Sequence, residues 1–157
     1  MISHSLVLKK LQNKLPDIVF EKGENCVWSP MNNKIIYNTV KPGQSEHDAI
    51  FALIHEVAHA SLGHHNYHTD TQLLQLESEA WSKAIEIAKE MNINIPEDHV
   101  QDCLDTYRDW SHKRSACPTC GVVSAQKANQ IYHCFNCQTA WKVPLSPLCQ
   151  LRRVVVN

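Results

Sequence analysis

Two cysteine pairs near the C-terminal end place the strongest restriction on how this chain can fold. Each pair has two residues between its cysteines, and thirteen residues separate the pairs, which are Cys117 with Cys120 and Cys134 with Cys137. Such a pair makes a tight turn whose backbone amides face the sulfur atoms, and two turns enclose a tetrahedral zinc ion. Redox-active dithiols are the alternative, but the βαβ pattern that surrounds them is absent. The spacing therefore predicts a zinc ribbon with one structural zinc, in which Val122–Val123 and Ile131–Tyr132 form short strands.

The other cysteines and the N-terminus bear on the compartment. Lys9 and Lys10 follow the first apolar residues, which is the reverse of the order in a signal peptide. We therefore expect a cytoplasmic chain, in which cysteines are metal ligands or free thiols rather than disulfides. Cys26, Cys103 and Cys149 have no partner at ligand spacing and are expected to be buried free thiols. The apolar runs are far too short for a membrane span.

Charge is distributed unevenly along the chain. Residues 111–157 contain six of the 15 Lys and Arg residues and no Asp or Glu. Residues 1–110 contain the other nine basic residues and all 16 acidic ones. Residues 1–110 and 111–157 thus carry about −7 and +6, which suggests two units. We expect a domain of residues 1–113 and a zinc ribbon with its tail, 114–157. The basic part either binds nucleic acid or lacks acids only because it is small.

The first 113 residues alternate between helical and strand-like patterns, which predicts an α+β domain. Ser45 and Asp48 form a capping box that opens a helix, and Gly63 ends it. Further helices are expected at 3–15, 71–91 and from Pro96 to about Trp110, and strands at 17–20, 26–28 and 34–40.

His55-Glu56-Val57-Ala58-His59 lies on the helix that follows Ser45. Residues four apart share a helix face, so His55 and His59 can bind one metal ion. Glu56 is rotated by about 100° and can reach a water on that metal without filling a ligand position. Zinc acidifies such a water and polarises a carbonyl group, while a glutamate carries the proton to the leaving amine. We therefore expect a catalytic zinc with Glu56 as general base. A core helix with hydrogen-bonded histidines is the alternative.

A catalytic zinc needs a third protein ligand, and three residues compete for this role. Glu77 falls within the apolar stripe of the next helix, where a carboxylate is costly unless it is paired or metal-bound. Glu79 shares its face with polar residues and is expected to be solvated. His65 lies ten residues after His55, as in the metzincin pattern, but that pattern places glycine at the position of Leu62. We choose Glu77. An oxyanion-stabilising residue is expected among His64, His65, Tyr67 and His68.

The sequence His55-Glu56-Val57-Ala58-His59-Ala60-Ser61-Leu62-Gly63-His64, followed by Glu77-x-x-Ala80, resembles the ImmA/IrrE family of zincin-like metallopeptidases over about residues 30–95. The resemblance implies His55, His59 and Glu77 as zinc ligands, Glu56 as the base, and a small mixed sheet. It also implies that an edge strand, here 34–40, aligns an extended substrate. Family members are often associated with a helix-turn-helix regulator, which is absent from this chain.

The order of a zincin domain and a basic zinc ribbon also resembles the SprT-like proteases, although no His-Gly-containing segment, which supplies their later histidine ligand, follows His68. The expected function is therefore zinc-dependent cleavage of a protein substrate, with a transcriptional regulator as one candidate. Nucleic acid is a further expected partner of the ribbon, where Tyr132, Phe135 and Trp141 would offer stacking faces. Alternatively, these aromatic residues pack the ribbon, and its positive face docks on the acidic zincin domain. The alternative function is a non-enzymatic module, with a vestigial zincin, that binds nucleic acid or protein.

Overall fold

The computed structural model describes residues 2–145 and 150–156, which form four α-helices and two small β-sheets. The class is therefore α+β, as predicted. The chain divides into two compact units, one of residues 1–65 and 78–96 and the other of residues 66–77 and 97–157. Helix α3 (Asp70–Glu90) contributes to both units. Cys149 lies outside the described residues.

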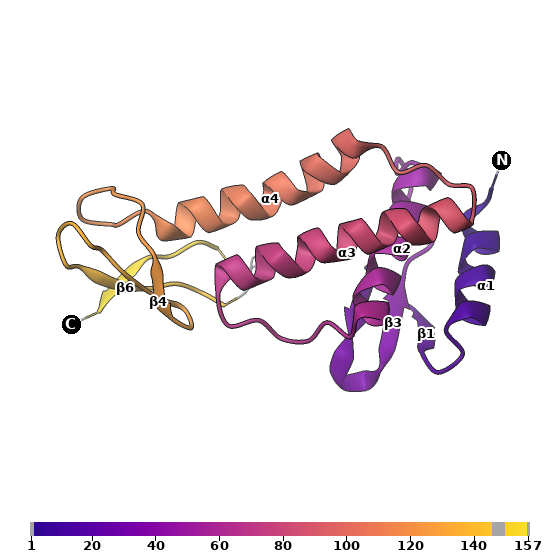
Figure 1. The fold of residues 1–157 in the computed structure, drawn as a ribbon, viewed down its shortest axis with the longest axis horizontal. Coiled ribbons are helices and arrows are strands. Elements are labelled where there is room, and N and C mark those ends of the chain that lie inside the picture. The colour runs from indigo at the N-terminus through magenta and orange to yellow at the C-terminus, as the bar shows by residue number, and fades with distance from the viewer. Residues whose placement is uncertain (1, 146–149, 157) are drawn as a thin grey trace. The chain divides into compact units, whose positions relative to one another are not determined.

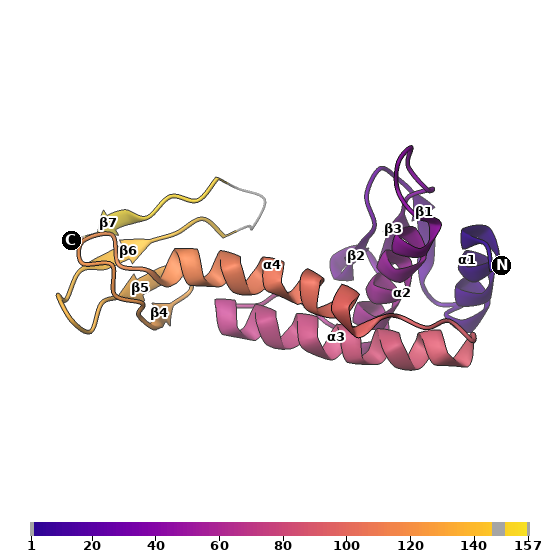
Figure 2. The same cartoon turned by 90° about the horizontal axis from the view of Figure 1, so that it is seen from above.

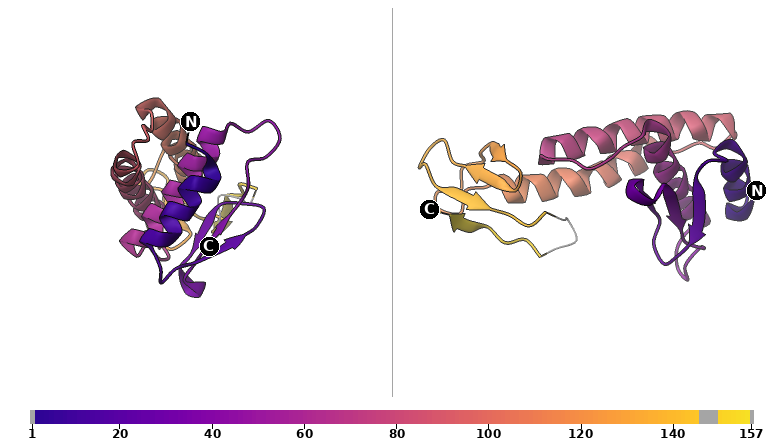
Figure 3. Two further views of the ribbon diagram at one scale, coloured as in Figure 1. Left: turned by 90° about the vertical axis from the view of Figure 1, so that its right-hand side faces the viewer. Right: turned by 90° about the horizontal axis from the view of Figure 1, so that it is seen from below.

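The first unit contains a mixed three-stranded sheet and the helices α1 and α2 (Figures 1 and 3). Its strands are β1 (Val19–Lys22), β2 (Val27–Ser29) and β3 (Lys34–Tyr37). β3 is the central strand and pairs parallel with β1 and antiparallel with β2. The expectation that residues 34–40 form an edge strand is therefore wrong, because β3 has a hydrogen-bonded neighbour on each side.

Helix α2 (Glu46–Leu62) forms the centre of this unit and contacts α1 (His4–Lys14), β2 and β3. Its core face carries fully buried aliphatic side chains, among them Leu53, Ile54 and Val57. Both predicted ends are confirmed. The Ser45 side chain accepts a hydrogen bond from the Asp48 amide, and Gly63 adopts the left-handed conformation, with φ of 64°, that favours glycine at a helix end.

The second unit contains helix α4 (Glu97–Ser115) and an antiparallel sheet. Figure 2 labels the four strands in their order across the sheet, which are β4 (Gln126–Ala128), β5 (Ile131–His133), β6 (Ala140–Lys142) and β7 (Val154–Val156). The expected strand at Val122–Val123 is reduced to a single bridge between Val123 and Ala116. Helix α4 extends beyond the expected end at Trp110, because no glycine or proline interrupts it before Pro118.

The interior of the second unit is built from aromatic rings and the ribbon cysteines. Tyr132 and Trp141 are both buried and stack with their ring centroids 5.4 Å apart. The Trp141 indole N–H donates to the Arg114 carbonyl at 2.9 Å, which ties the strands to the end of α4. These two rings therefore pack the ribbon and do not offer stacking faces for nucleic acid, whereas Phe135 is 69% exposed.

Candidate metal centres

Helix α2 brings His55 and His59 together on one of its faces. Their Nε2 atoms lie 3.1 Å apart, close to the spacing of about 3.3 Å for two nitrogens on one tetrahedral zinc ion. The His55 ring is buried and stacks on the indole of Trp81 with a centroid distance of 4.2 Å. This stacking holds His55 against α3, and its imidazole is therefore fixed before any metal binds.

Glu77 completes a group of three possible metal ligands. One ligand atom from each of His55, His59 and Glu77 lies within 4.8 Å of the other two. Glu77 is only 6% exposed, and a buried carboxylate is costly unless a partner or a cation compensates its charge. Two imidazoles and one carboxylate form a donor set used by catalytic zinc sites. These residues fit a zinc ion, and the geometry favours the choice of Glu77.

The two rival ligands lie elsewhere. Within the described part of the chain, neither Glu79 nor His65 belongs to a group that could hold a metal ion. His65 is exposed, whereas the Glu79 carboxylate lies 3.4 Å from Nε2 of His64. Glu79 was expected to be solvated, and its side chain is indeed 47% exposed.

Glu56 follows His55 on α2, and its side chain is positioned by the sheet. The backbone N–H of Trp28, in β2, donates to Oε2 of Glu56 at 2.6 Å. The Cys26 thiol also interacts with Glu56. Burial, and then the negative charge of Glu56, raises the pKa of Cys26 to about 12. Cys26 is therefore a neutral thiol, and Glu56 is a half-buried carboxylate with a defined orientation.

His64 occupies a position that the sequence did not predict. It was expected in a polar loop, but it is buried, and its Nδ1 lies 2.9 Å from Nδ1 of His59. The Trp28 indole N–H also donates to the His64 carbonyl at 2.9 Å. Of the other expected oxyanion-stabilising residues, Tyr67 donates its hydroxyl to the Leu145 carbonyl and His68 is exposed. The signal for His64 was its position directly after the glycine that ends α2.

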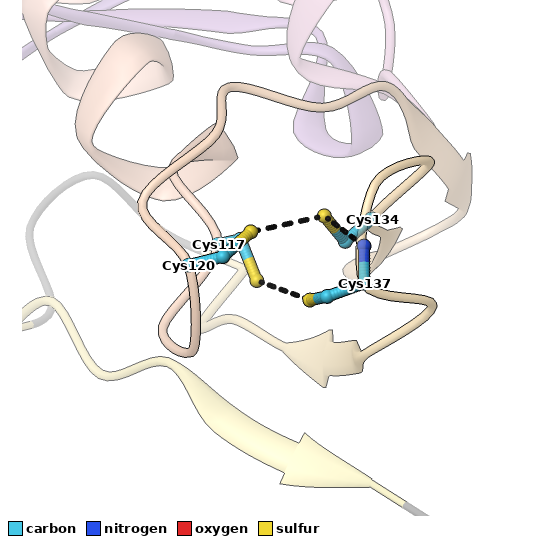
Figure 4. A group of neighbouring side chains, drawn as sticks. All are labelled: Cys117, Cys120, Cys134 and Cys137. Atoms are coloured by element: carbon cyan, nitrogen blue, oxygen red, sulfur yellow. Dashed lines mark hydrogen bonds between the residues drawn. The ribbon is translucent and has the colours of Figure 1, made fainter.

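The four cysteines of the ribbon form the second centre (Figure 4). Sγ of Cys117 lies 3.6 Å from that of Cys137, and Sγ of Cys120 lies 3.5 Å from that of Cys134. Zn–S bonds of about 2.3 Å place two tetrahedral ligands about 3.8 Å apart, whereas a disulfide needs about 2.05 Å. The geometry is therefore compatible with a zinc site, as predicted from the spacing.

Both cysteine turns have the same local geometry. The Gly121 amide donates to the Cys117 carbonyl at 2.9 Å, and the Gln138 amide donates to the Cys134 carbonyl at 3.0 Å. Gly121 and Gln138 have φ of 76° and 63°, so each turn closes with a left-handed residue. The Cys137 amide also points at Cys134 and is the main cause that lowers the pKa of this thiol to about 6. A metal ligand must be a thiolate, so the Cys137 amide favours the form of Cys134 that binds metal.

Comparisons with known proteins provide no assignment: no protein-family model, no curated protein and no solved structure matches this chain. Among the described residues, no helix combines the length and the apolar character needed to cross a membrane.

Proposed function

We propose that this chain is a zinc-dependent endopeptidase that hydrolyses peptide bonds of a protein substrate. The convergence of His55, His59 and Glu77 within 4.8 Å carries this proposal. A second zinc in the four-cysteine centre would have a structural role, and a reducing compartment such as the cytoplasm would maintain its thiolates. The resemblance of residues 30–95 to the ImmA/IrrE family supports the same function and suggests a transcriptional regulator as substrate.

Each residue of the site has a separate role in the proposed hydrolysis. When bound, zinc would polarise the scissile carbonyl and acidify the attacking water. Glu56 accepts the proton of that water and delivers it to the leaving amine. The Trp28 N–H donates to Oε2 of Glu56 and so orients the carboxylate for this transfer. The His55 ring is held by stacking on Trp81, so this ligand needs little rearrangement.

Strand β2 is the part of the sheet that would align the substrate. β2 is an outer strand of the three-stranded sheet, and the Trp28 amide on it reaches Glu56. An extended peptide that pairs with an outer strand gains main-chain hydrogen bonds without requiring a particular sequence. Pairing along β2 would place a peptide bond beside Glu56. This role replaces the one expected for residues 34–40.

Metal analysis and peptide hydrolysis together test the proposal. The purified chain should contain two zinc ions, and substitution of the cysteines or of the histidines should each remove one. Hydrolysis of a mixed peptide library, read by mass spectrometry, should require zinc and disappear in Glu56→Gln. Two bound zinc ions with no hydrolysis of any library peptide or of candidate regulators would favour the alternative, a non-enzymatic binding module.

A further inference from the structure

A chain of three side chains extends from the metal-binding face of α2 to the surface. Nε2 of His59 faces His55, whereas Nδ1 of His59 lies 2.9 Å from Nδ1 of His64. On the opposite side of the His64 ring, Nε2 lies 3.4 Å from the Glu79 carboxylate. Both nitrogens of each imidazole therefore have a neighbour in this chain, and all these residues belong to the same compact unit.

The end of helix α2 creates this arrangement. Gly63 reverses the chain with its positive φ, and the His64 amide then donates to the His59 carbonyl at 3.0 Å. This reversal turns the buried His64 ring back onto His59, with 5.0 Å between the ring centroids. The Trp28 indole, which donates to the His64 carbonyl, fixes the same residue from the sheet. Backbone contacts on two sides therefore define the position of His64.

Metal binding determines the direction of the hydrogen bonds. An imidazole that binds a metal through Nε2 is neutral and carries its proton on Nδ1. The Nδ1–H of His59 then donates to Nδ1 of His64, which must be an acceptor. The proton of neutral His64 consequently lies on Nε2, where it faces the negative Glu79. Each step places a donor opposite an acceptor, and the negative charge lies at the end remote from the metal.

We propose that His64 and Glu79 are positioning residues that fix the tautomer and orientation of His59 and so strengthen zinc binding at the proposed catalytic site. Hydrogen bonds of this kind typically raise metal affinity by about 10- to 100-fold. Glu79, the rejected candidate for a zinc ligand, would thus act on the metal through two histidines. The inference rests on the proposed function, because it concerns the same metal site.

The test measures zinc affinity by competition with a chelator, and the ribbon centre serves as an internal reference. His64→Leu should weaken the catalytic site by about 10- to 100-fold and leave the ribbon unchanged. His64→Gln, whose side-chain oxygen can accept the Nδ1–H of His59, should recover part of this loss. Glu79→Ala should give a smaller loss, and Glu86→Ala, on the same helix, should give none.

Tautomers give an independent measurement. In the zinc-loaded protein, ¹⁵N NMR of the histidine rings should show His59 protonated on Nδ1 and His64 protonated on Nε2. Zinc bound to His59 through Nδ1 would overturn the inference, as would affinities within about twofold of wild type for both His64→Leu and Glu79→Ala. If His64→Leu does not fold, Glu79→Ala decides the matter. A wild-type protein that binds zinc only at the ribbon would instead refute the proposed function itself.

Discussion

The backbone N–H of Trp28 donates a hydrogen bond of 2.6 Å to Oε2 of Glu56, which joins an outer strand of the sheet to the proposed general base. The indole N–H of the same residue donates to the carbonyl of His64, whose ring contacts the proposed metal ligand His59. One residue of β2 therefore holds both the base and the segment that follows α2. A substrate that pairs with β2 would bind next to a carboxylate already oriented by that strand.

Replacement of Glu56 by Gln should abolish peptide hydrolysis and leave the fold and the zinc content intact. The amide oxygen of Gln can still accept the Trp28 N–H, whereas the variant can no longer take up a proton from water. Loss of general base catalysis should lower kcat by at least about 10²-fold. Glu86→Gln, on the surface of α3, is the matched control. Turnover close to wild type in Glu56→Gln would refute the proposed mechanism.

Glu77→Ala should empty the proposed catalytic site even in excess zinc, because two histidines alone bind zinc weakly. His65→Ala should keep the site full. Glu79→Ala should also keep it full under excess zinc, although the affinity falls. Metal content per chain after gel filtration measures these outcomes. If His65→Ala empties the site and Glu77→Ala does not, the metzincin-like ligand set is the correct one.

Local signals predicted the parts of this molecule that depend on neighbouring residues. Ser45 and Gly63 fixed the ends of α2, because capping bonds act within one turn. The cysteine spacing predicted the four-sulfur cluster in the same way. The central place of β3 was missed, because strand order depends on contacts between distant segments. The contact of His64 with His59 was missed as well. Gly63 predicts that the helix ends, but not the direction in which the next residue points.

Arg114 should be essential for the stability of the second unit. Its guanidinium is buried and forms two hydrogen bonds with Asp70, at 2.7 and 3.3 Å, while Tyr132 donates to the same carboxylate. Arg114→Ala leaves that carboxylate buried without its cation, which typically costs about 3–5 kcal/mol. Urea denaturation monitored by tryptophan fluorescence measures the loss.

The control for this change is Arg108→Ala. Arg108 pairs with Asp105 on the surface of α4, where an ion pair contributes less than about 1 kcal/mol. A free energy of unfolding that falls equally in both variants would show that the buried pair has no special importance.

Cys26 should be nearly inert to alkylation in the folded protein. Burial and the charge of Glu56 raise the pKa of this thiol to about 12, so the thiolate that reacts is scarce at pH 8. Its labelling by iodoacetamide, followed by mass spectrometry of the peptide that contains it, should be about 10³-fold slower than in urea, where the pKa is about 8.5. Glu56→Gln should speed the reaction of the folded protein, because it removes the charge that opposes the thiolate. An equal rate in folded and unfolded protein would contradict the position of Cys26.

The ribbon should bind nucleic acid mainly through its positive charge, because two of its three expected stacking residues are buried. No acidic residue follows residue 110, so the field around the ribbon sheet is positive. Tyr132 and Trp141 are buried, which leaves the exposed Phe135 as the stacking face among the three expected aromatic residues. Binding should therefore depend mainly on phosphate contacts, weaken steeply with salt and differ little between sequences.

Fluorescence anisotropy with single-stranded and duplex DNA of equal length, at salt concentrations from 20 to about 200 mM, measures these properties. Replacement of Lys127, Lys142 and Arg152 by Ala should weaken binding to both forms and reduce its salt dependence. Phe135→Ala should affect the single strand alone, because bases stack on an exposed ring only when they are unpaired. Glu86→Ala, in the other compact unit, should change neither form. No detectable binding at the lowest salt would refute the nucleic-acid role and leave the ribbon as a zinc-stabilised structural element.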